Sequence, residues 1–176
     1  MRSGSGGLST VSCGRMDSVS GWGQRREFWA ASEVSGMREI DGIRSWLEAA
    51  AGLAELLEVA WDAFSLMLAA CQECEGQSVE LFAAFAFAAS AAATGRRVLV
   101  AAPSLPPRQG NGTGHEAIVQ HDVEEIGDGL AGLAHLLGVR LSAAVGQAPD
   151  PGDRRACQDA AAEAARICEL LARERR

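Results

Sequence analysis

Four cysteines stand at spacings that could support metal or redox chemistry. Cys71 and Cys74 form a C-x-x-C pair, and Cys157 and Cys168 are eleven residues apart, about three helical turns, so they share one helix face. Four thiolates that meet between helices could hold zinc or an iron–sulfur cluster, and a C-x-x-C alone could be a redox pair. Each cysteine also falls on an apolar stripe, where free Cys behaves as a small hydrophobic side chain. We expect core packing, with a metal site or a redox pair as the alternatives.

A glycine motif lies farther along the chain. The segment from Gly127 to Gly132 matches G-x-G-x-x-G, which binds dinucleotides when it joins a strand to a helix and its glycines let backbone amides reach a pyrophosphate. Here the motif falls inside a helical apolar pattern. Packing of small residues between helices therefore explains it, and we predict no nucleotide or cofactor site.

The other reactive residue types do not form a recognisable catalytic set. The three histidines lack the Glu-x-x-His pairs that a di-iron bundle needs; they are His115, His121 and His135. There is no Gly-x-Ser-x-Gly elbow. All sixteen basic residues are arginine, which removes lysine-based Schiff-base and P-loop chemistry. We expect no catalytic residues and no enzymatic activity; an enzyme of unrecognised type stays as a third option.

The composition indicates which elements position these residues. Alanine occurs 33 times and tyrosine is absent. Alanine favours helices strongly but buries little area, and Val, Ile and Thr are too sparse for a sizeable sheet. The composition therefore predicts an all-α protein with closely packed helices and a thin core.

Apolar residues at alternating spacings of three and four predict four helices. We expect them at about 45–75, 78–94, 113–144 and from 150 onward. Ser45 with Glu48 has the form of a capping box for the first, and Asp150 before Pro151 is a preferred start for the fourth. The second is apolar all round and should lie centrally. Together they predict a four-helix bundle or a similar small helical array.

The first 36 residues differ in kind from the rest. They are rich in Ser and Gly and show no apolar period, so we expect a disordered leader, with residues 37–176 forming a single helical domain. A second interpretation is that translation starts at Met16 or Met37. The leader has no continuous apolar core of the kind that a secretory signal needs.

Charge narrows the range of partners. The formal net charge is −7, and long stretches on both sides of residue 100 carry acids without bases, which repel phosphate backbones. The longest uncharged apolar run, 81–94, is shorter than the roughly 20 residues of a membrane span. We therefore expect no nucleic-acid partner, no membrane span and a cytoplasmic location. The absence of Lys indicates a GC-rich coding bias that is typical of bacteria.

These observations favour a small non-catalytic helical protein that acts through protein–protein contact, either with an unknown protein partner or as a homodimer. The alternative is a bundle that binds a metal through the core cysteines, or a small apolar ligand in an aromatic pocket beneath Trp61, Phe64 and Phe85.

Overall fold

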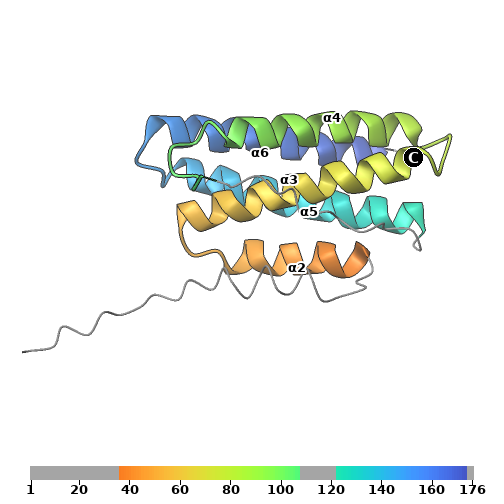
Figure 1. Cartoon of the computed structure of the whole chain (residues 1–176), viewed down its shortest axis with the longest axis horizontal. Helices are drawn as coiled ribbons and strands as arrows, with labels where there is room; N and C mark the ends of the chain where they lie inside the picture. The colour runs from red at the N-terminus through yellow and green to blue at the C-terminus, as the bar shows by residue number, and fades with distance from the viewer. Residues whose placement is uncertain (1–35, 108–121, 174–176) are drawn as a thin grey trace, which may run out of the picture. The chain divides into compact units, whose positions relative to one another are not determined.

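The computed structural model describes residues 36–107 and 122–173, and all the regular structure in these ranges is helical. The helices are α2 (Gly36–Ala49), α3 (Leu53–Glu75), α4 (Phe82–Leu99), α5 (Val123–Val145) and α6 (Pro151–Arg173) (Figure 1). The all-α prediction is confirmed. The expected leader, the helix start at Thr113 and two of the histidines, His115 and His121, lie outside the described residues, apart from Gly36 at the leader's end.

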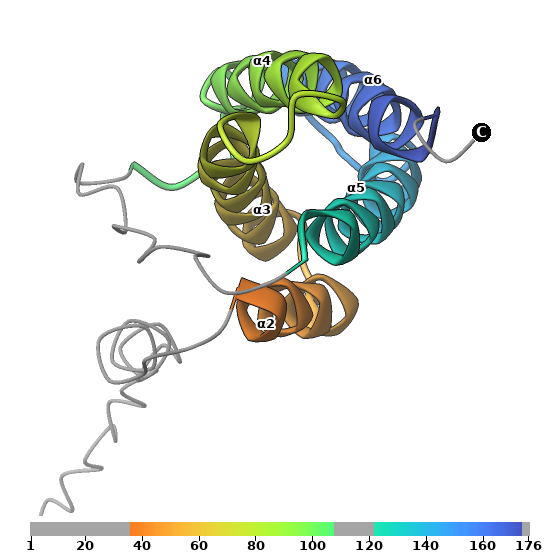
Figure 2. The same ribbon diagram turned by 90° about the vertical axis from the view of Figure 1, so that its right-hand side faces the viewer.

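Four of these helices form a bundle, as predicted. Viewed end-on, α3, α4, α6 and α5 follow one another around a ring, and α2 lies outside it against α3 and α5 (Figure 2). The most extensive contacts join α5 to α6, α3 to α4, and α4 to α6. Two local hairpins, α3–α4 and α5–α6, therefore pack through the long-range α4–α6 contact.

The predicted helix at 45–75 is wrong in one respect, because the chain breaks at residues 50–52 into α2 and α3. Ser45 lies inside α2 and caps nothing. Gly52 has an extended backbone and precedes α3, while the Glu55 carboxylate accepts a 3.2 Å hydrogen bond from the Ala51 amide. Arg140 of α5 donates to the Ala50 carbonyl at 2.5 Å. The apolar period runs through the break unchanged, which is why spacing alone did not locate it.

The first nine residues of α2, 36–44, were not predicted to be helical. Its apolar residues Ile40, Ile43 and Leu47 recur at spacings of three and four, and all three are fully buried. The side-chain ends of Met37 and Ile40 lie beside Gly129 of α5. The signal was present in the sequence, but the apolar run is short and directly follows the Ser- and Gly-rich leader.

Three other boundaries differ from the expected ones, and one agrees. The helix predicted over 113–144 is wrong at its start, because α5 begins at Val123, where the Asp122 carboxylate accepts a 3.1 Å bond from the Glu124 amide. The Ser78 hydroxyl accepts a 3.3 Å bond from the Leu81 amide in the turn before α4, so the helix begins at Phe82, and it runs through Gly95 to Leu99. At α6 the Asp150 carboxylate accepts a 2.6 Å bond from the Gly152 amide, which confirms the predicted cap.

The core is thin, as the composition predicts. Helix α4 buries mainly alanines, together with Phe85, Gly95 and Leu99. Small side chains let neighbouring helices approach closely, and the largest fully buried groups, Phe64 and Phe85, fill the remaining space. The prediction that this helix lies centrally is wrong, because each helix of the ring has an outward face. On the outward face of α4, Phe82 and Phe87 are 53% and 55% exposed.

Candidate functional sites

The four cysteines do not meet. Cys71 and Cys74 are buried in the last turns of α3, which lead into the start of α4, whereas Cys157 is buried near the start of α6, beside the end of α4. Cys168 is only partly buried. Within residues 36–107 and 122–173, no group of three or more His, Cys, Asp or Glu side chains could hold a metal ion.

The buried thiols are held in their protonated form. Burial raises the pKa of Cys74 to about 11, and the nearby Glu73 carboxylate contributes to this rise. The pKa of Cys157 is raised to about 11 by burial and by Asp153. The pKa of Cys71 is raised well above its usual range, mainly by burial. Because the thiolate is the reactive and metal-binding form, this environment opposes nucleophilic and metal chemistry at neutral pH.

The glycine motif lies wholly inside α5, in its second and third turns. A Cβ at Gly129 would come 3.1 Å from the Ile40 side chain, and one at Gly132 would come 2.9 Å from the Arg44 guanidinium. Both neighbours belong to α2. These two glycines therefore make room for the α2 side chains, and the strand-to-helix turn of a nucleotide site is absent from this stretch of α5.

A buried polar contact, not found by sequence reasoning, fastens the segment after α4 to α6. The Asp153 side chain is fully buried. One carboxylate oxygen accepts a 2.9 Å bond from the Ser104 amide, and the other accepts a 2.6 Å bond from the Ser104 hydroxyl. Asp153 also lies in the first turn of α6, where the helix dipole favours an anion. The serine hydroxyl donates its hydrogen bond to this carboxylate, so we interpret the pair as a structural contact and call it the clasp between Ser104 and Asp153. Residues 49 apart with no shared motif leave no sequence signal for such a contact.

The expected aromatic pocket is not assembled from its three residues. Phe64 is fully buried against Gly95, and Trp61 is half-buried with the Arg96 guanidinium 5.4 Å from its ring centroid. Phe85 lines a pocket of about 300 Å³ between the start of α4, the start of α5 and the end of α6, and neither Trp61 nor Phe64 is among the lining residues of this pocket. Its lining residues are Leu81, Ala84, Phe85, Val123, Glu124, Gly127, Asp128 and Leu171.

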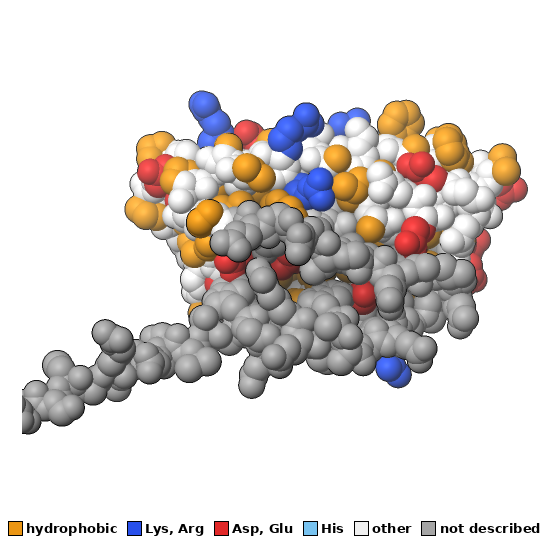
Figure 3. All heavy atoms as spheres, viewed as in Figure 1, with side chains coloured by type: hydrophobic (Ala, Val, Ile, Leu, Met, Phe, Trp, Pro, Cys, Tyr) orange, Lys and Arg blue, Asp and Glu red, His pale blue; other side chains and the backbone are white. Residues whose placement is uncertain are grey.

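The outward face of α4 is the most apolar helix surface in the described part of the chain. The described residues include five exposed large hydrophobic side chains, and three of them lie on this face or just before the start of α4. These three are Val79, Phe82 and Phe87, at 96%, 53% and 55% exposure. Small exposed or half-buried residues fill the space between them, namely Ala83, Ala86, Ser90 and Ala93. In the space-filling view, hydrophobic side chains gather over the N-terminal part of α4 (Figure 3).

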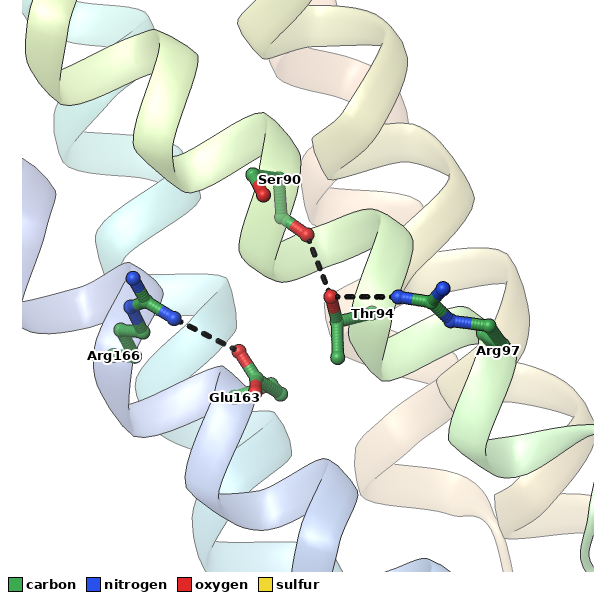
Figure 4. Close-up of polar contacts among 5 residues, drawn as sticks. All are labelled: Ser90, Thr94, Arg97, Glu163 and Arg166. Carbon is green, nitrogen blue, oxygen red and sulfur yellow. Dashed lines mark hydrogen bonds and ion pairs between the residues drawn. The ribbon is translucent and has the colours of Figure 1, made fainter.

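The C-terminal half of this face is small and polar (Figure 4). The Thr94 hydroxyl donates to the Ser90 carbonyl at 3.0 Å and accepts from the Arg97 guanidinium at 3.2 Å. The adjacent surface of α6 carries the pair Glu163 and Arg166, whose charged atoms are 4.0 Å apart. The hydroxyl of Thr94 is thus satisfied within its own helix, which lowers the cost of covering it.

None of the helices in the described ranges is long and apolar enough to cross a bilayer. No protein-family model matches the chain, and comparisons with curated proteins and with solved structures find no match.

Proposed function

We propose that this chain is a non-catalytic helical protein that acts through protein–protein contact, and that its partner is a second copy docked on the outward face of α4. The observation that carries the proposal is the exposure of Val79, Phe82 and Phe87 along one side of a helix whose other side is buried. Exposed apolar groups that lie together mark contact sites more often than scattered ones do. A bacterial cytoplasm, where the cysteines stay as thiols, is the proposed setting.

The distribution of side-chain sizes favours an antiparallel pair. Both phenylalanines of the face lie in the N-terminal half of α4, whereas the small Ser90 lies at its middle and Ala93 and Thr94 lie in the C-terminal half. A two-fold axis crossing α4 between residues 88 and 89 would set the large half of one copy against the small half of the other. Phe87 would then lie level with Ser90 of the second copy. Such an interface is self-complementary, as two-fold symmetry requires.

Charge supports the same arrangement. Glu80 precedes α4 and Arg97 lies near its end, and both are exposed. The same two-fold axis brings Glu80 of one copy level with Arg97 of the other, so that opposite charges meet at both ends of the pair. A parallel pair would instead bring arginine against arginine. Complementary rim charges of this kind set orientation and specificity more than affinity.

The experiment is sedimentation velocity of the full chain over a concentration series. We expect a monomer–dimer equilibrium that Phe87→Glu shifts to the monomer. Val139→Glu is the matched control, because Val139 of α5 has a similar exposure, 53%, away from α4; it should leave the dimer intact. Glu80→Arg and Arg97→Glu should each weaken the dimer, and the double variant should restore it. Circular dichroism checks that each variant is folded.

Two outcomes would overturn the proposal. A wild-type chain that stays monomeric at every concentration removes the second copy as partner. A dimer that Phe87→Glu leaves unchanged, or that Val139→Glu disrupts equally, places the contact on another surface.

A further inference from the structure

The pocket at the end of the bundle has a mixed lining that indicates a class of ligand. It lies among the turn before α4, the first turns of α5 and the last turns of α6. Phe82 and Phe87 do not line it; the α4 residues that do, Ala84 and Phe85, are buried. The pocket is therefore separate from the outward face of α4, and binding of a ligand in it does not depend on the proposed dimer.

The interior of the pocket is apolar. Leu81, Phe85, Val123 and Leu171 supply its larger side chains. A Cβ at Gly127 would lie 3.7 Å from the tip of the Phe85 ring, in ordinary contact. Phe85 is only 1% exposed, so its ring is covered on nearly all sides, and Gly127 packs against the ring tip. At about 300 Å³, the space is at the lower end of the range of small-molecule sites, roughly 300–1,000 Å³.

The charged groups of the lining are both acidic. Glu124 and Asp128 are four residues apart, on one face of α5, and both are exposed. Like charges at this spacing destabilise a helix slightly. Asp122, which caps α5, adds a third carboxylate at the start of the helix. Together they outweigh the partial positive charge of the helix N-terminus, about half a unit, and none of the described residues that line the pocket is an arginine.

We infer that this pocket binds a small organic cation with an apolar body, such as an amine carried on an aromatic or hydrocarbon group. The apolar body would lie against the half-buried Leu81 and Val123, where its burial removes hydrocarbon surface from water. The ammonium group would stay at the acidic rim beside Glu124 and Asp128, within reach of water and both carboxylates. An anionic ligand of the same shape would be repelled there.

The test is a titration of the ¹⁵N-labelled full chain with three probes of one shape: 2-phenylethylamine, the neutral 2-phenylethanol and the anionic 3-phenylpropanoate. We expect the amine to shift the amide signals of residues 81–85 and 123–128 and that of Leu171. The alcohol should bind more weakly and the anion should not bind. Each rim substitution, Glu124→Gln or Asp128→Asn, should lower affinity for the amine about twofold to fivefold, as for an exposed ion pair, without changing affinity for the alcohol.

Two further variants separate the pocket from general surface charge. Glu125→Gln removes an exposed carboxylate of the same helix that does not line the pocket, and should leave binding unchanged. Gly127→Leu fills the space beside Phe85 and should abolish binding of both the amine and the alcohol. Equal affinity for amine and alcohol, shifts at other residues, or an equal effect of Glu125→Gln would each overturn the inference. Phe87→Glu should not alter amine binding, so a failed dimer and a failed pocket give different results.

Discussion

The ring of Phe64 on α3 lies directly over Gly95 on α4. A Cβ built at residue 95 would fall 2.5 Å from Phe64 Cζ and closer still to Cε1, distances that real carbon pairs do not adopt. Both residues are buried, and Phe64 is fully so. The predicted helix over 78–94 stops just before Gly95, but Gly95 lies inside α4 and provides the space in which the α3 ring packs.

This contact predicts that Gly95→Ala destabilises the fold even though alanine is the better helix former. Alanine gains up to about 1 kcal/mol of helix propensity, whereas overpacking a core typically costs about 1–3 kcal/mol. We expect a lower urea midpoint for the variant. In a Phe64→Leu background the same substitution should be neutral or stabilising. An unchanged midpoint for Gly95→Ala alone would show that the ring moves aside freely.

The clasp between Ser104 and Asp153 should contribute measurably to stability. Ser104→Ala removes the hydroxyl donor to a buried carboxylate and should lower the free energy of unfolding by about 1.5–3 kcal/mol, the range for hydrogen bonds to charged groups. A double-mutant cycle with Asp153→Ala measures the coupling directly. If the loss in the double variant equals the sum of the losses in the two single variants, the contact contributes nothing of its own.

Stability should fall in alkali because of the buried thiols. The pKa values of Cys74 and Cys157 are about 11 in the folded chain, against an ordinary 9.0. Below pH 9 both the folded and the unfolded chain keep these thiols protonated, so the thiols' contribution to the free energy of unfolding is fully present. Between pH 9 and 11 only the unfolded chain releases them, so each thiol costs about 1.4 kcal/mol per pH unit.

The chain offers a clean test, since it has neither Lys nor Tyr to titrate in this range. Urea unfolding at pH 8, 9, 10 and 11 gives the slope of the free energy of unfolding against pH. Cys157→Ala should make this slope smaller by the contribution of one thiol. A stability that is flat from pH 9 to 11 would contradict the raised pKa values.

Gly42 offers room for a stabilising substitution. It lies inside α2, and a Cβ there would meet nothing within 4 Å. Gly42→Ala should therefore raise the free energy of unfolding by up to about 1 kcal/mol, through helix propensity and a less flexible unfolded chain. Thermal unfolding measures it. Gly95→Ala, which makes the same chemical change in a crowded place, is the matched comparison.

Much of the helical architecture could be predicted because helix periodicity is a local property. The start of α6 at Asp150 and Pro151 followed from cap chemistry alone. The break between α2 and α3 could not be found in this way, since the apolar spacing continues through it. At the break, Arg140, ninety residues later in the chain, donates to the Ala50 carbonyl, and spacing within one helix carries no sign of such a long-range contact.

The candidate sites were less accessible to sequence reasoning. Cys71, Cys74 and Cys157 were correctly predicted to be core residues. Which side chains share a pocket depends on helix order around the ring, which periodicity does not encode. Phe85 and Leu171, far apart in the chain, line one cavity only because α4 and α6 are neighbours.

The position of α2 has a consequence for how the chain folds as it leaves the ribosome. Helix α2 precedes all the other described helices along the chain, yet it packs against both α3 and α5, and the arginine that holds its end is residue 140. At about 5–20 residues per second, that arginine is synthesised roughly 5–20 s after Ala50. From the synthesis of Leu99 until then, the α3–α4 hairpin has all its own residues, whereas the apolar stripe of α2 still lacks its contact surface on α5. The first of the described helices to be made is thus expected to be among the later ones to reach its final place.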